Sequence, residues 1–141
     1  MERIKVYLAG GMTGLTEEEQ TKWRTHIINS IKENDGFTKL PDFFNPTYYY
    51  SPLNDNHKSE KEVMEYELDK LRHSDLVVVN FNSPNSIGTA MEVAVARENK
   101  IPILGVNIDN KCIHPWLTEC CMRICETEDE VINYIIHYYL N

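Results

Sequence analysis

The chain has 141 residues, of which 42% are hydrophobic and 26% charged, as is typical of a single soluble globular domain over residues 1–141. The formal net charge of −8 argues against nucleic acid or a membrane surface as a partner, because phosphate groups would be repelled. The charged start of the chain is unlike a signal peptide, and no apolar run approaches the roughly 20 residues of a membrane span. We therefore expect a cytoplasmic protein.

The first predicted element is a strand over residues 4–9, a short apolar run with β-branched side chains. It leads into Gly10, Gly11 and Gly14, which permit tight turns and close approach of a ligand to the backbone. The sequence therefore predicts a strand that ends in a ligand-accessible loop.

A helix is predicted next, beginning at a capping box formed by Thr16 and Glu19 and ending near Gly36. Three apolar residues at four-residue spacing are expected to face the sheet: Trp23, Ile27 and Ile31. A short second strand is predicted over residues 37–40, closed by Pro41.

Residues 41–58 form the least regular segment, rich in aromatic rings and prolines. A long aromatic loop is unusual in a compact domain. It is either an Ω-loop that packs its rings on its own body, a lid over a ligand, or a subunit contact.

A second helix is predicted from the capping-box pattern of Ser59 and Glu62, with an inward face made by Met64, Leu68 and Leu71. The strand that follows, residues 75–80, contains three consecutive valines. This unbroken apolar run indicates burial on both faces, as in a parallel sheet.

The last third of the chain continues the alternation. A helix over residues 89–99 packs through Met91, Ala94 and Val95. It is followed by a strand over 101–106, a short helix over 115–121 and a short strand over 122–125. A last helix begins at a capping box of Thr127 and Glu130 and packs through Val131, Ile135 and Tyr138 or Tyr139.

This alternation predicts an α/β fold, a flavodoxin-like (Rossmann-like) three-layer sandwich with a five-stranded parallel sheet in the order 2-1-3-4-5. Ligands in such sheets bind beyond the carboxyl ends of the strands where the order reverses, between strands 1 and 3. The loops over residues 10–14 and 80–88 are therefore expected to face each other across one crevice.

The second of these loops has the composition of an anion site. A loop of small residues that feeds a helix N-terminus presents free N–H groups, and the helix dipole favours negative charge. Ser86 adds a hydroxyl donor and Gly88 removes obstruction. Glu92 has two interpretations: it completes a capping box with Thr89, or it is a functional acid.

Further residues favour the functional interpretation. Tyr7 lies near the end of the first strand, from which its hydroxyl can reach Glu92. On the helix before the third strand, Glu67 lies near the packed face, whereas Asp69 points elsewhere. Two carboxylates beside a phosphate-sized pocket suit glycosyl transfer, with one nucleophile and one proton donor. The helix dipole is expected to keep Glu92 ionised.

Four segments, YLAGGMTG, SDLVVVN, SxGTAMEVAVA and KIPILG, together resemble the nucleoside 2-deoxyribosyltransferase family. That family includes the 2′-deoxynucleoside 5′-monophosphate N-glycosidases. The resemblance implies a retaining double displacement in which the acid matching Glu92 attacks C1′ of the sugar and the tyrosine matching Tyr7 orients it. It also implies a homodimer or larger assembly with shared active sites, and a nucleotide or nucleoside substrate.

Two positions that differ among members of this family bear on the substrate and on the acid that protonates the leaving base. Ser86 stands where monophosphate hydrolases carry serine and transferases of free nucleosides tend to carry aspartate. Glu67 stands where the family commonly has the aspartate that protonates the leaving base, with Asp69 as the alternative. Gly10, Gly11, Ser86 and Gly88 are expected to cradle the phosphate and sugar. The family's phosphate contact from a neighbouring subunit falls near residues 114–118.

The cysteines of the last third are Cys112, Cys120, Cys121 and Cys125. Reduced thiols are expected in a cytoplasmic protein, and the spacings lack the CxxC pairs of a zinc site. His114 nearby leaves a metal site open as an alternative, but we expect no metal and no cofactor.

The sequence thus predicts an N-glycosidase acting on a (2′-deoxy)nucleoside 5′-monophosphate. Its first alternative is a deoxyribosyltransferase that exchanges bases on free nucleosides. Its second is a nucleotide-binding sensor module without turnover, in which Glu92 serves only as a cap. The phosphoribohydrolases that release cytokinin bases share the glycine and the GTxxE pattern but have a richer glycine run before the threonine.

Overall fold

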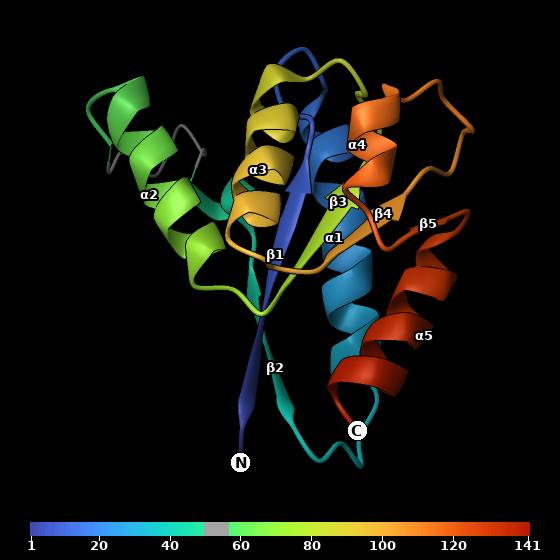
Figure 1. The fold of residues 1–141 in the computed structure, drawn as a ribbon. Coiled ribbons are helices and arrows are strands. Elements are labelled where there is room, and N and C mark those ends of the chain that lie inside the picture. Colours follow the sequence, from blue (N-terminus) through green and yellow to red (C-terminus); the bar gives the residue numbers. More distant parts are fainter. Residues whose placement is uncertain (50–56) are drawn as a thin grey trace.

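The computed structural model describes residues 1–49 and 57–141, so the predictions for residues 50–56 of the aromatic loop lie outside the described part (Figure 1). Five parallel strands form one sheet in the order β2-β1-β3-β4-β5, which confirms the predicted topology. The strands are β1 (Arg3–Gly10), β2 (Leu40–Phe44), β3 (Leu76–Asn80), β4 (Ile103–Val106) and β5 (Arg123–Cys125).

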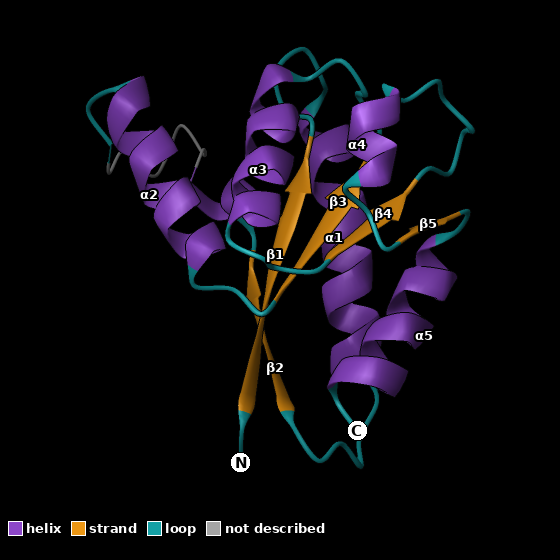
Figure 2. Cartoon of the chain, in the orientation of Figure 1, coloured by secondary structure: helices purple, strands orange, loops and turns teal. Residues whose placement is uncertain are grey.

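Helices cover both faces of this sheet (Figure 2). On one face α1 (Glu17–Lys32) and α5 (Glu128–Tyr139) pack on one apolar cluster. On the other face α2 (Glu60–Arg72), α3 (Ile87–Glu98) and the short α4 (Pro115–Glu119) pack on a second cluster. A 3₁₀ turn, η1 (Pro46–Tyr49), follows β2. The result is the predicted three-layer α/β sandwich.

The second strand lies later in the chain than predicted. It covers Leu40–Phe44 and so contains Pro41, which the prediction had placed beyond its end. β2 pairs only with β1 among the described strands and is therefore an edge. An edge strand tolerates proline because the missing N–H faces away from the ladder.

The predicted inward faces of α2 and α5 are confirmed in part, because Leu68, Leu71, Val131 and Ile135 are buried and Tyr139 packs against the core. At the start of α2, however, Val63 is buried, whereas the predicted Met64 is 38% exposed. In α3 Val93 and Ala96 are buried, whereas the predicted Met91 and Ala94 face solvent. In α5 Ile132 is buried beside Val131 and Ile135, whereas Tyr138 is exposed. Several of these helices carry apolar residues on more than one side, so spacing alone leaves the face undecided.

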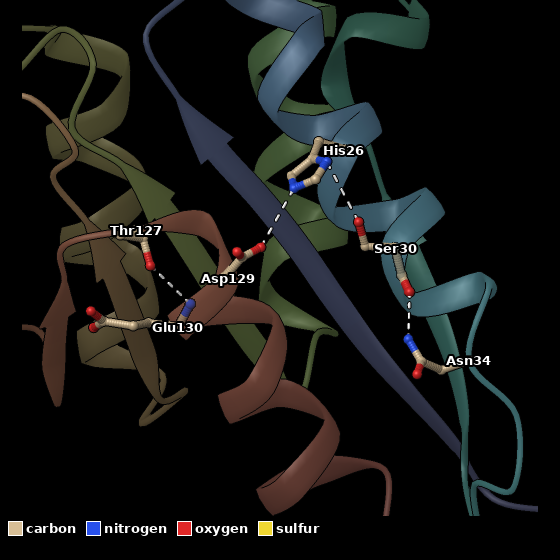
Figure 3. Close-up of polar contacts among 6 residues, drawn as sticks. All are labelled: His26, Ser30, Asn34, Thr127, Asp129 and Glu130. Carbon is tan, nitrogen blue, oxygen red and sulfur yellow. Dashed lines mark hydrogen bonds and ion pairs between the residues drawn. The ribbon is translucent and has the colours of Figure 1, made fainter.

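An exposed polar contact joins α1 and α5, and further polar contacts lie within each helix (Figure 3). His26 Nε2 lies 3.8 Å from Asp129 Oδ1, an ion pair that forms only when the imidazole is protonated. His26 Nδ1 is 3.5 Å from the hydroxyl of Ser30, and the hydroxyl of Thr127 caps α5 by accepting from the N–H of Glu130. Because these side chains are exposed, the buried apolar cluster supplies most of the packing between the two helices.

Only the first of the three predicted capping boxes is complete. At α1 the Glu19 N–H donates to the Thr16 hydroxyl at 3.1 Å, and the Thr16 N–H donates to the Glu19 carboxylate at 3.0 Å. At α2 and α5 the cap hydroxyl accepts from the N–H three residues later, but the glutamate carboxylate accepts from the residue before the cap. None of the helices in the described part has the length and apolar character that crossing a bilayer requires.

Candidate active site

A cleft of about 610 Å³ opens beyond the carboxyl ends of β1 and β3, where the strand order reverses. This is the position predicted from topology, and the volume is that of a small-molecule site. The cleft is walled by the loop after β1, the start of η1, one side of α2 and the first turns of α3. Its lining includes Gly10, Met12, Thr13, Arg24, Met64, Glu67, Ser86, Gly88, Met91 and Glu92.

The fold brings Tyr7 and Glu92 together across 85 residues of sequence. The Tyr7 hydroxyl donates a hydrogen bond of 2.5 Å to Glu92 Oε2. Tyr7 is fully buried in β1, and its ring stacks on Phe44 of β2 with centroids 5.2 Å apart. Burial and the nearby Glu92 raise the pKa of the Tyr7 phenol, so it stays protonated and keeps the hydrogen that it donates to Glu92.

Glu92 does not cap its helix, because α3 begins earlier than predicted. The N-cap is Ser86, whose hydroxyl accepts from the Thr89 N–H at 3.3 Å. Glu92 therefore lies in the second turn, and the capping-box interpretation with Thr89 is wrong. Its carboxyl projects into the cleft instead, where it meets Tyr7.

The expectation that the helix dipole keeps Glu92 strongly ionised is not met. Burial raises the pKa of the Glu92 carboxyl to about 7, although the hydrogen bond from Tyr7 and the nearby Arg24 both lower it. A position in the second turn is too far from the helix end for the dipole to offset this desolvation. At neutral pH the carboxyl is thus divided between its two forms.

Ser86 keeps one hydrogen available for a ligand. Its hydroxyl oxygen accepts from both the N–H and the hydroxyl of Thr89, at 3.3 and 3.1 Å. The single hydroxyl hydrogen of Ser86 therefore remains to donate into the cleft, which Ser86 lines. The N–H groups of Ile87 and Gly88, the first two residues of α3, have no acceptor within the helix and add to this donor set.

The glycines of the predicted cradle have different environments. Gly10 and Gly88 line the cleft, and a Cβ at Gly88 would enter open space. Gly11 is not among the lining residues. Its N–H donates to the Asn82 side chain at 3.1 Å, and a Cβ there would lie 2.5 Å from the Ser83 Cβ. Gly11 therefore lets the two loops touch.

This difference predicts opposite outcomes for two alanine substitutions. Gly11→Ala is expected to lower the melting temperature by several degrees, because the loop after β1 must move away from Ser83. Gly88→Ala is expected to leave the melting temperature nearly unchanged and to weaken ligand binding by filling the cleft. Thermal denaturation of both variants checks this, and a larger loss of stability for Gly88→Ala would contradict it.

Helix α2 carries both candidate acids but points their side chains in different directions. Glu67 lines the cleft with Glu92, whereas the exposed Asp69 lines a different depression and lies 3.6 Å from His73 Nδ1. Residues two apart on a helix point about 200° apart, so both cannot face one cleft. The geometry brings Glu67 to the site and leaves Asp69 outside it.

Sequence reasoning missed Arg24, which is fully buried in α1 and lines the cleft. A signal was present, because Arg24 lies three, four and seven residues before Ile27, Ile28 and Ile31, on the buried stripe of the helix. A charged residue on that stripe marks a buried polar environment. The predicted inward face included Trp23, Ile27 and Ile31 but not Arg24.

His114 has a structural role at the start of α4. Its Nδ1 accepts a hydrogen bond of 3.1 Å from the Trp116 N–H. Within residues 1–49 and 57–141, no group of three or more His, Cys, Asp or Glu side chains is arranged to hold a metal ion.

The fold and the cleft define a class: flavodoxin-like α/β proteins with a buried tyrosine–carboxylate pair at the topological switch point. The family model described as nucleoside 2-deoxyribosyltransferase-like matches residues 3–109. The chain therefore belongs to the nucleoside 2-deoxyribosyltransferase-like family. A search of curated protein sequences finds no match.

Solved structures share this fold at low sequence identity. A 2-deoxyribosyltransferase from Bacillus psychrosaccharolyticus has a TM-score of 0.71 at 16% identity, over 92% of this chain and 91% of that one. A 2-deoxyribosyltransferase from Leishmania mexicana has 0.67 at 14%, over 97% and 99%. A CMP N-glycosidase from Clostridium botulinum has 0.59 at 16%, over 93% and 96%.

Proposed function

We propose that the protein is an N-glycosidase that cleaves the N-glycosidic bond of a (2′-deoxy)nucleoside 5′-monophosphate, releasing free base and (deoxy)ribose 5-phosphate. The observation that carries the proposal is the 2.5 Å contact of the Tyr7 hydroxyl with the Glu92 carboxylate inside a cleft of about 610 Å³. A capping role for Glu92 would place it in the first turn of α3, but the N-cap is Ser86 and Glu92 lies in the second turn.

The reaction proceeds in two displacements at C1′ of the sugar. In the first, ionised Glu92 attacks C1′, the bond from C1′ to the base nitrogen breaks, and the base leaves with the electron pair and a proton from Glu67. In the second, water attacks C1′, gives its proton to the Glu67 carboxylate, and the ester to Glu92 breaks. Tyr7 holds the attacking carboxylate in one orientation.

The choice of a monophosphate rests on Ser86. Its free hydroxyl hydrogen and the N–H groups of the first turn of α3 suit a phosphate. Gly88 leaves room for the sugar and phosphate, because a Cβ there would enter open space, whereas a Cβ at Gly10 would lie 2.9 Å from the Trp23 ring and so Gly10 allows close packing behind the cleft. The similar solved structures include both deoxyribosyltransferases and a CMP N-glycosidase, so fold likeness alone does not choose between these activities.

Incubation of the protein with dCMP, dGMP and dTMP, each with and without an acceptor base, tests the proposal. Release of free base without an acceptor supports a hydrolase. Reaction of free nucleosides but not monophosphates would show a base-exchanging transferase and would refute the role of Ser86. Tight binding without turnover would show a sensor module.

The activity is expected to fall as the pH is lowered through about 7. Glu92 must be ionised to attack C1′, and burial places its pKa at about 7 in the free protein. Measurement of kcat/KM for dCMP between about pH 5 and about pH 9 checks this. A rate that rises as the pH falls from about 8 to about 6 would mean that the protonated carboxyl is the active form.

We also propose that the chain assembles as a homodimer or larger oligomer. Ile87 on α3 and Trp116 on α4 are 79% and 80% exposed, and Met91 on α3 is 42% exposed. Both helices cover the same face of the sheet (Figure 1), and Ile87 and Met91 also line the cleft. Large apolar side chains this exposed are typical of an interaction surface.

Trp116→Glu is therefore expected to convert the oligomer to monomer and to lower activity, because a charge would enter an apolar contact. Sedimentation velocity measures the assembly state. The control is Tyr138→Glu, at an exposed aromatic residue on α5 across the sheet. Wild-type protein that sediments as a monomer at about 100 μM would contradict the proposal.

A further inference from the structure

The guanidinium of Arg24 is tied to the strand that carries Tyr7. Arg24 is fully buried, and its Nε and Nη2 donate to the carbonyls of Leu8 and Gly10 at 3.2 and 3.3 Å. Its Nη1 donates to the Gln20 carbonyl at 2.5 Å, one turn earlier in α1. Leu8 and Gly10 follow Tyr7 closely in β1, so these contacts fix the end of the strand beside the reactive pair.

A buried cation needs a compensating negative charge, and main-chain carbonyls supply only dipoles. The acids that face Arg24 are Glu92 from α3 and Glu67 from α2, which line the same cleft. Burial lowers the pKa of the Arg24 guanidinium to about 10, while Glu92, Tyr7 and Glu67 act to raise it. Arg24 is therefore charged throughout the neutral range.

We propose that Arg24 is a positioning residue for the Tyr7–Glu92 pair: its charge favours the carboxylate form of Glu92, and its carbonyl contacts hold the end of β1 in place. Its three hydrogen bonds engage the main chain, so it acts on the reaction through Glu92 and Tyr7. The kinetic consequence rests on the proposed function. The effect on the titration of Glu92 does not, because it exists without turnover.

Within residues 1–49 and 57–141, the ionisable groups around Glu92 come from three elements. Tyr7 from β1 donates to it, Arg24 from α1 favours its charge, and Glu67 from α2 lines the same cleft. Glu60 and Lys61, at the start of α2, also line the cleft. A change at Arg24 must therefore be measured at Glu92 itself, with these other groups left intact.

The test is a carboxyl ¹³C NMR titration of protein labelled at glutamate, with the Glu92 signal assigned by its loss in Glu92→Gln. We expect a midpoint near pH 7 in the wild type, an upward move of about one pH unit or more in Arg24→Gln, and a smaller move in Arg24→Lys, which keeps the charge. Lys22→Gln removes the same charge from an exposed position on α1 and should leave the midpoint unchanged. If the protein turns over dCMP, the low-pH limb of kcat/KM should move by the same amount.

Arg24→Gln removes the hydrogen bonds to the carbonyls of Leu8 and Gly10 as well as the charge. A second measurement therefore follows Arg24 itself in the unsubstituted protein. The Arg24 Nε–H resonance should shift with the midpoint of Glu92 in the wild type and stay constant in Glu92→Gln. An unchanged Glu92 midpoint in folded Arg24→Gln, or a constant Nε–H resonance in the wild type, would overturn the proposal. So would weaker dCMP binding at an unchanged midpoint, because Arg24 would then contact the ligand. Failure of every nucleotide to react would refute the proposed function and leave this titration decisive for Arg24.

Discussion

Glu92→Gln is expected to reduce base release from dCMP by about a thousandfold or more while dCMP still binds. Glutamine keeps the size of the side chain and can still contact the Tyr7 hydroxyl, but its amide cannot form the glycosyl ester. Steady-state assays give the rate, and calorimetry gives the affinity. The matched control is Glu98→Gln, at an exposed acid on the same helix, which should behave as the wild type.

A covalent adduct is the direct evidence for this role. Peptide mass spectrometry after rapid quenching should find the sugar phosphate on the peptide that contains Glu92 in the wild type, and no adduct in Glu92→Gln. If the variant kept near wild-type activity, Glu92 would not be the nucleophile and the sensor interpretation would gain support.

The same variant has a stability signature that needs no substrate. The folded pKa of Glu92, about 7, lies above the ordinary glutamate value of 4.5. Its contribution to stability is therefore fully present below about 4.5 and is lost as the pH rises through about 7. Glutamine at this position does not ionise, so Glu92→Gln does not lose this stability as the pH rises. Its free energy of unfolding should exceed that of the wild type at pH 8 by on the order of 3 kcal/mol, and should equal it at low pH.

Ser86→Asp is expected to lower kcat/KM for dCMP by about a hundredfold while sparing deoxycytidine. A carboxylate beside the substrate phosphate adds repulsion of about 1 to 4 kcal/mol per charge pair near a protein surface. Aspartate is as good an N-cap as serine, so the start of α3 should survive. The two substrates, assayed with one preparation, give the ratio directly.

Ser86→Asn is the matched control for this prediction. Asparagine also caps helices but carries no charge, so its effect on dCMP should be much smaller than that of aspartate. Equal losses on dCMP and deoxycytidine in Ser86→Asp would mean that the phosphate lies elsewhere, and the argument from Ser86 for a monophosphate would fail.

Much of the fold follows from local pattern. The valine run of β3, the alternation of strands and helices, and the complete capping box at Thr16 and Glu19 all lie within single segments. The strand order and the position of the cleft then follow from the general rules of parallel sheets. The extent of β2 does not follow from local pattern, because it depends on Pro41 lying in an edge strand of the sheet.

The sequence by itself determined the topology, the place of the cleft, and the pairing of Tyr7 with Glu92 as a candidate. These depend on periodicity, on glycine-rich loops and on the resemblance of short segments. Only the tertiary structure decided that Ser86 caps α3 and that Arg24 lies in the cleft with Glu92 and Glu67. It also decided that burial raises the pKa of Glu92 to about 7. The physical reason is that desolvation and charge act through space, between segments as far apart in sequence as β1 and α3.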